Sequence, residues 1–303
     1  MKSSFRYFLW GLVGAVIFLA VILLVLHFQP TSVAAQVESR ARREEDVNQM
    51  RFHLASATEA EKSAVLATTD KDSQVFADQA RAETATVESL RADFEALAQT
   101  GKERDLLAEF SKAFTEFQQI DAQLLDLAVK NTNLKATALT FGPAAAAIDD
   151  MDAALMRLIA QGESSASPNA RQVMLLAAGA QAGVRRIQVL LPPHIAEESD
   201  SKMDELEARM AAEDQQVRKD LKELANLLPS NTDLGAAAAR YATFSELRKE
   251  ILALSRANTN VRSLTISLNE KRTVTALCQD TLSALEKTIE DESIPGENVI
   301  NPR

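Results

Sequence analysis

The stretch NTNLKATAL, residues 131–139, decides the fold that we expect, because a close relative of it, NTNVRSLTI, occurs at 258–266. In both places an Asn-Thr-Asn step ends an apolar helical pattern and opens a new one. A basic residue, Lys135 or Arg262, follows each step at the same distance. A long segment that recurs in this way indicates an internal repeat.

The same offset of 127 residues aligns further segments upstream of each step. The matching pairs are DAQLLDLAVK (121–130) with RKEILALSRA (248–257), and LRADFEALAQ (90–99) with VRKDLKELAN (217–226). One offset that serves regions so far apart predicts a duplicated module, near 37–162 and 168–291.

The composition of the 303 residues indicates long helices. Hydrophobic residues make up 46%, but aromatic residues only 5%, and the chain has nine Gly and eight Pro. Such a composition favours an all-α fold. The net charge of −10 lacks the basic footprint of nucleic-acid binding, so no nucleic-acid partner is expected. The single cysteine, Cys278, excludes an internal disulfide.

Helix-breaking residues divide each module into four segments. The boundaries lie at 68–73, 99–102 and 131–133 in the first module, and at 192–199, 229–233 and 258–260 in the second. Helix-period stripes such as Leu106, Phe110, Phe114 and Phe117 need partner helices. We therefore predict two tandem up-down-up-down four-helix bundles, at 37–162 and 170–291, joined by a linker at 163–169.

The Asn-Thr-Asn steps have a structural interpretation in this scheme. Asn131 and Asn258 can close one helix, and Asn133 and Asn260 can cap the next. Gly142-Pro143 predicts a kink inside the fourth helix of the first module. We expect the lone cysteine to be a core residue.

The N-terminus reads as a membrane anchor. Tyr7–Leu26 is twenty residues long and uncharged, which is enough to span a bilayer. Lys2 and Arg6 precede it, so residues 1–29 are expected to be a cytoplasmic tail and transmembrane helix. The remainder would then lie in the periplasm, on the bacterial inner membrane. A signal peptide cleaved near Ser32-Val33-Ala34 is the alternative. Residues 292–303 are expected to form a C-terminal tail.

Both modules resemble the four-helix-bundle sensory module of methyl-accepting chemotaxis proteins. The residues that carry the resemblance are an aromatic pair, a Leu-rich seam and the polar step: Phe114, Phe117, Leu124, Leu127 and Asn131–Asn133, and again Tyr241, Phe244, Ile251, Leu254 and Asn258–Asn260. The resemblance implies an extracytoplasmic bundle that pairs with itself and binds a small solute. The chain departs from that family by lacking a second span and a cytoplasmic signalling hairpin, so we expect no output domain.

Contact with a small or anionic ligand is predicted at the two steps. Asn and Thr supply donors and acceptors, and the basic residue supplies charge for a carboxylate. The candidate residues are Asn131, Thr132, Asn133, Lys135, Asn258, Thr259, Asn260 and Arg262. Their alternative role is that of caps and solvated turns.

Catalysis is not expected. His53 and Met50 lie on one side of a helix and cannot ligate haem axially, and no Glu-x-x-His di-iron motif occurs. We predict no enzyme activity, no metal and no cofactor. Two functions stay open: a membrane-anchored sensor for a solute or protein partner, or an accessory subunit of a larger membrane complex. A protein partner or self-association through helix packing is expected in either case.

Overall fold

The computed structural model describes residues 33–293 of the chain. Within that range all regular structure is helical, which confirms the expected all-α class. The helices are α2 (Val33–Leu66), α3 (Asp70–Leu97), α4 (Gly101–Ala128), α5 (Thr132–Leu139), α6 (Ala145–Glu163), α7 (Ala170–Ala196), α8 (Asp200–Leu227), α9 (Thr232–Ala257), α10 (Thr259–Ile266) and α11 (Arg272–Glu290). Two π-helical turns, η1 (Thr140–Ala144) and η2 (Ser267–Lys271), interrupt the fourth segments at matching positions.

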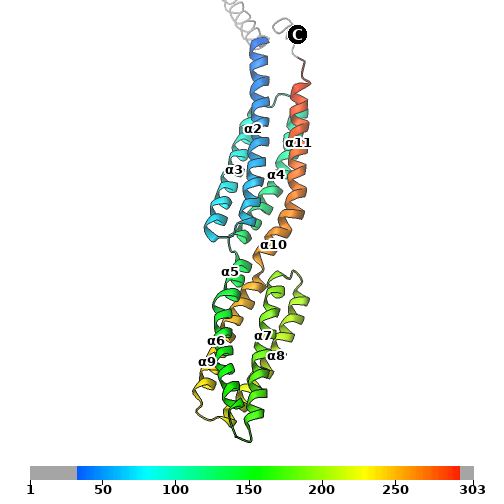
Figure 1. Ribbon diagram of the computed structural model, residues 1–303. Coiled ribbons are helices and arrows are strands. Elements are labelled where there is room, and N and C mark those ends of the chain that lie inside the picture. The colour runs from blue at the N-terminus through cyan, green and yellow to red at the C-terminus, as the bar shows by residue number, and fades with distance from the viewer. Residues whose placement is uncertain (1–32, 294–303) are drawn as a thin grey trace, which may run out of the picture.

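The helices form two four-helix bundles stacked end to end (Figure 1). In what we call the first bundle, α2, α3 and α4 pack with α11. In the second bundle, α7, α8 and α9 pack with α6 and its extension α5. The two long helical stretches α4–α5–η1–α6 and α9–α10–η2–α11 therefore each run through both bundles (Figure 1).

This pairing corrects the predicted domain boundaries. Residues 37–162 and 170–291 do not each form a bundle, because the two modules exchange their fourth helices. The segment 163–169 is a loop between α6 and α7 inside the second bundle, and the connections between the bundles are the two Asn-Thr-Asn steps.

The exchange follows from the direction that the chain takes at the two steps. Only Asn258 separates α9 from α10, and only residues 129–131 separate α4 from α5. Reversal between antiparallel helices takes a loop of two or more residues that turns the chain back. One residue at Asn258 is too short for such a loop, and residues 129–131 continue the chain forward in the same way, so each chain segment enters the other bundle.

Side chains that cap helices begin α3, α4 and α9 within the boundaries predicted from the sequence. Thr100 begins α4 with a capping box, in which its hydroxyl accepts from the Glu103 amide and the Glu103 carboxylate accepts from the Thr100 amide. Thr69 caps α3, and Asn231 caps α9. The boundary expected at Pro192-Pro193 falls slightly later, since both prolines lie in the final turns of α7, which ends at Ala196.

The core of the first bundle contains the predicted aromatic stripe. Phe110, Phe114 and Phe117 are buried and stack in succession, with ring centroids 5.4 and 5.6 Å apart. Cys278 is fully buried beside them, as expected of a core residue. Gly142-Pro143 lies in η1, which agrees with the predicted irregularity.

The predicted membrane anchor, Tyr7–Leu26, lies outside the described residues, as does most of the tail 292–303. Among the helices of residues 33–293, none combines the length and apolar character needed to cross a bilayer.

Candidate functional site

The two Asn-Thr-Asn steps meet where the bundles join, and we call the six residues 131–133 and 258–260 the junction. Asn131 and Asn258 adopt left-handed backbone conformations, with φ of 50° and 52°. This is the geometry predicted for residues that close a helix, and Asn is one of the few residues that tolerate it.

The junction is held by reciprocal hydrogen bonds between the two steps. The Thr132 amide donates to Thr259 Oγ1 at 3.2 Å, and the Thr259 amide donates to Thr132 Oγ1 at 3.1 Å. The Asn133 amide likewise donates to Asn260 Oδ1 at 3.1 Å, and the Asn260 amide to Asn133 Oδ1 at 3.2 Å. Each step therefore caps the helix of the other module, whereas we had expected it to cap its own.

Further bonds of the Asn side chains tie the junction to both bundles. Asn133 Nδ2 donates to Asn258 Oδ1 and to the Ile195 carbonyl, both at 2.7 Å. Asn260 Nδ2 donates to Asn131 Oδ1 at 3.0 Å. The junction thus fastens the two long helical stretches to each other and to the end of α7.

The charged members of the predicted ligand site lie outside this network. Lys135 Nζ pairs with Asp70 Oδ2 at 3.0 Å, and Lys135 and Asn131 together lower the pKa of the Asp70 carboxyl. Arg262 is exposed on α10. Because the Asn and Thr groups bond to one another, their geometry supports a structural role, and ligand contact at these residues stays a prediction.

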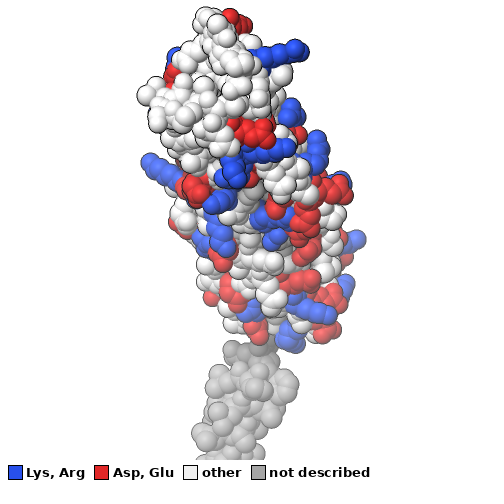
Figure 2. All heavy atoms as spheres, turned by 90° about the horizontal axis from the view of Figure 1, so that it is seen from below, with Lys and Arg blue, Asp and Glu red and all other residues white. Residues whose placement is uncertain are grey.

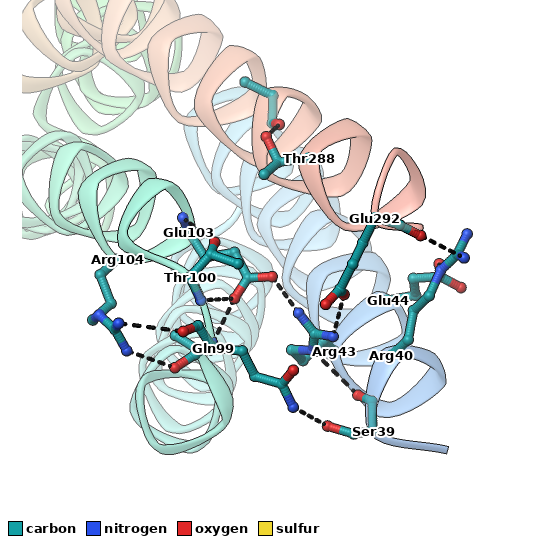
Figure 3. Close-up of polar contacts among 12 residues, drawn as sticks. Ser39, Arg40, Arg43, Glu44, Gln99, Thr100, Glu103, Arg104, Thr288 and Glu292 are labelled. Carbon is teal, nitrogen blue, oxygen red and sulfur yellow. Dashed lines mark hydrogen bonds and ion pairs between the residues drawn. The ribbon is translucent and has the colours of Figure 1, made fainter. Parts of the chain in front are cut away.

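A second polar centre lies at the end of the first bundle where α2 begins and α11 ends; we call it the end pole. Arg43 is almost fully buried there and pairs through Nη1 with Glu103 Oε1 on α4. Its Nη2 pairs with Glu292 Oε2, just beyond α11, at 2.6 Å (Figure 3). One guanidinium thereby links three segments, including both ends of the described chain.

Backbone groups reinforce the end pole. Arg40 Nη2 donates to the Glu290 carbonyl at 3.0 Å, and Arg40 Nη1 to the Glu292 carbonyl at 3.3 Å. The Glu103 carboxylate that binds Arg43 also closes the capping box of α4 (Figure 3). A shift of α11 against α2 must therefore disturb the start of α4 as well.

A third centre, the buried charge cluster, consists of Glu61 on α2, Asp121 on α4 and Lys271 on η2. All three residues are at most 3% exposed. Lys271 Nζ lies 2.5 Å from Asp121 Oδ1 and 3.0 Å from the centroid of the Phe117 ring. Burial raises the pKa of Glu61 and lowers that of Lys271, although Asp121 opposes the latter shift.

The second bundle has no such cluster at the matching positions. The offset of 127 places Arg248 opposite Asp121 and Ala144 opposite Lys271. Arg248 Nη2 bonds instead to Asp214 Oδ1 on α8 at 3.0 Å. The buried ionisable groups of the second bundle include Asp152, Asp220 and His194, and His194 Nε2 lies 2.9 Å from Glu207 Oε1.

The end pole and the buried charge cluster were missed by the sequence argument. A usable signal was present for the cluster, since Asp121 falls on the apolar stripe between Phe117 and Leu124. Lys271 falls on a stripe with Val274 and Cys278 in the same way. A charge at helical spacing on a core face indicates a buried partner.

Residues 39–172 match a known family model. The model is described as a four helix bundle sensory module for signal transduction. The resemblance to the sensory module is thereby confirmed for residues 39–172, which run from α2 to the start of α7. The last matched helices, α5 and α6, are those that pack in the second bundle. No curated protein matches the chain.

Proposed function

We propose that this protein is a non-catalytic sensor for a small solute or a protein partner, in which the two bundles act as one relay. The observation that carries the proposal is the course of the two long helical stretches. Each passes through the second bundle, the junction and the first bundle, so a shift of one against the other reaches the end pole.

The end pole is suited to receive such a shift. Arg43 joins α2, α4 and the end of α11 through two carboxylates, so relative movement of these segments changes its ion pairs. Packed helices with discrete alternative contacts are a common means of passing a change between distant sites. We further propose that Tyr7–Leu26 anchors this pole to the inner membrane, with both bundles in the periplasm.

The surface gives one indication of the partner. Figure 2 shows Lys and Arg interspersed with Asp and Glu over most of the face it draws, with one end almost free of charge. Mixed charge of this kind does not select a partner by long-range attraction alone. We therefore place recognition in local contacts, among which Lys135 and Arg262 are exposed cations beside the junction.

The test uses the full-length protein in mild detergent. Thermal unfolding is first followed with amino acids, organic acids and common anions. A solute that raises the midpoint should also change the distance between spin labels at Val37 and Glu290, which flank the end pole. Labels at Val37 and Glu45, both on α2, provide the control pair whose distance should stay constant.

Two results would contradict sensing. One is a bound solute that leaves the distance between Val37 and Glu290 unchanged. The other is the absence of any solute response, together with purification in fixed stoichiometry with other membrane proteins. That second result would support an accessory subunit of a larger membrane complex.

A further inference from the structure

Glu61 is an acid in the core of the first bundle whose carboxylate oxygens both lack a hydrogen-bond partner. Its side chain is 0% exposed. An ionised carboxylate in such a place loses its hydration, and the Ser267 hydroxyl offsets this loss less than burial opposes it, whereas the neutral acid loses much less. The surroundings of Glu61 therefore favour the protonated form.

The charges around Glu61 are already paired with one another. Lys271 Nζ lies 2.5 Å from Asp121 Oδ1, 3.5 Å from the Phe117 carbonyl oxygen and 3.0 Å from the centroid of the Phe117 ring. These contacts account for the three donors of the ammonium group. The Lys–Asp pair is thus complete without Glu61.

The other elements packed against Glu61 supply little charge. The residues that α3 buries are uncharged: Ser73, Ala77, Ala80, Thr84, Val87 and Phe94. On α2 itself, Lys62 is exposed and acts on Glu61 less strongly than Lys271 does. On α11, the thiol of Cys278 acts on Lys271, and burial raises the pKa of this thiol to about 12.

We propose that Glu61 is a proton-binding site, which is protonated when the first bundle is packed as the structure shows it. Loss of its proton to water draws Lys271 away from Asp121. An ionised Glu61 needs a donor, and the Lys271 ammonium is the cation that acts on it most strongly. Moving that ammonium leaves Asp121 without its ion-pair partner. The packing of the first bundle around Asp121 is therefore lost when Glu61 loses its proton.

The position of Lys271 on the backbone allows this movement with little loss of regular helical hydrogen bonds. It lies at the end of η2, a π-helical turn, where the regular hydrogen-bond register is already broken. The Ser267 hydroxyl at the start of η2 also acts on Glu61. Because η2 connects α10 to α11, a shift there reaches the junction on one side and the end pole on the other.

The first test compares the pH dependence of stability in the full-length wild type, Glu61→Gln and Glu59→Gln. Burial raises the pKa of Glu61 above the ordinary 4.5, so the folded state holds a proton that the unfolded state has lost. The folding constant of wild type relative to Glu61→Gln should therefore fall by up to about tenfold per pH unit above that value. Glu59→Gln removes an exposed charge from the same helix and should run parallel to wild type.

Infrared spectroscopy locates the proton directly. As pH is raised above the ordinary pKa of a carboxyl, wild type should keep the carbonyl stretch of a protonated carboxylic acid to a higher pH than Glu61→Gln does. A constant ratio of folding constants, or a band that both proteins lose at the same pH, would overturn the proposed site.

The second test measures the coupling to Lys271. Cys278 is the single cysteine of the chain and is fully buried, so its modification by a thiol reagent reports opening of the core near Lys271. The rate for wild type divided by that for Glu61→Gln cancels the intrinsic pH dependence of thiol reactivity. This ratio should rise with pH, and a flat ratio would show that Glu61 does not control the packing.

Discussion

The two bundles derive from one repeat, yet their interiors are built differently. The first bundle has stacked phenylalanines and the buried charge cluster, while the second has Ala144 and Arg248 at the positions of Lys271 and Asp121. The helices, their breaks and the π-helical turns nevertheless occur at the same places in both. Apolar stripes and the junction are therefore common to both bundles, whereas the cluster of Glu61, Asp121 and Lys271 belongs to the first bundle alone.

The largest effect should come from removing the charge that distinguishes the first bundle. Lys271→Ala leaves Asp121 buried without its partner, and breaking a buried ion pair in this way costs roughly 3–5 kcal/mol. Denaturant unfolding of the full-length protein measures the loss. Lys287→Ala, an exposed lysine on α11, is the control and should change stability by about 0.5 kcal/mol or less. If the two variants are equally stable, the cluster has no structural importance.

The next effect compares the side-chain hydrogen bonds that the two Asn-Thr-Asn steps contribute to the junction. Asn133 makes three side-chain bonds, to Ile195, Asn258 and Asn260, whereas Asn260 makes two, to Asn131 and Asn133. Each partner left unsatisfied and buried costs about 1 kcal/mol or more, so Asn133→Ala should cost about 3 kcal/mol and Asn260→Ala about 2 kcal/mol. The same unfolding assay applies, and a larger loss for Asn260→Ala would contradict the asymmetry.

A smaller effect is expected from the close approach of α7 and α8 in the second bundle. A Cβ added at Gly183 would lie 2.5 Å from Val217 Cγ2, while one at Gly235 on α9 would meet no atom within 4 Å. Gly183→Ala should therefore cost about 1–3 kcal/mol through overpacking. Gly235→Ala should stabilise the protein by about 0.5–1 kcal/mol, since Ala favours the helix. If Gly183→Ala and Gly235→Ala changed the stability in the same direction, this would show that α7 can move away from α8.

The smallest effect concerns the left-handed residues of the junction. At Asn131 and at Asn258, replacement by Ala should be less stable than replacement by Gly by about 1–2 kcal/mol, because only Gly avoids the Cβ penalty. Comparing Ala with Gly at one position isolates the backbone, since both variants lose the amide. A difference at one position but not at the other would mean that the two steps are not equivalent.

The sequence predicted the helices, the repeat and most helix ends because these depend on local patterns. Thr100 and Asn231 are capping residues next to the helices they begin, and Phe110, Phe114 and Phe117 lie on one face at helical spacing. The exchange of the fourth helices was not predicted. The apolar residues of the two fourth helices do not indicate which bundle buries which helix, and the need of the buried Lys271 for Asp121 on α4 was not recognised.

Ligand contact at the Asn-Thr-Asn steps stays a prediction, whereas their role as helix ends is confirmed. The Asn-Thr-Asn steps were correctly identified as a special feature, but their partners were not, since each step bonds to residues 127 positions away. Arg43, Glu103 and Glu292 come together only in the folded chain.

The sequence by itself determined an all-α chain of two repeated modules, because helical periodicity and capping act over a few residues. The tertiary structure alone decided which module closes which bundle. At both Asn-Thr-Asn steps the chain continues forward, so α4 and α9 lead into the opposite bundle, although breaks of three residues reverse the chain between α2 and α3 and between α7 and α8. It also brought Glu61, Asp121 and Lys271 together, because a core can join charges that lie far apart along the chain.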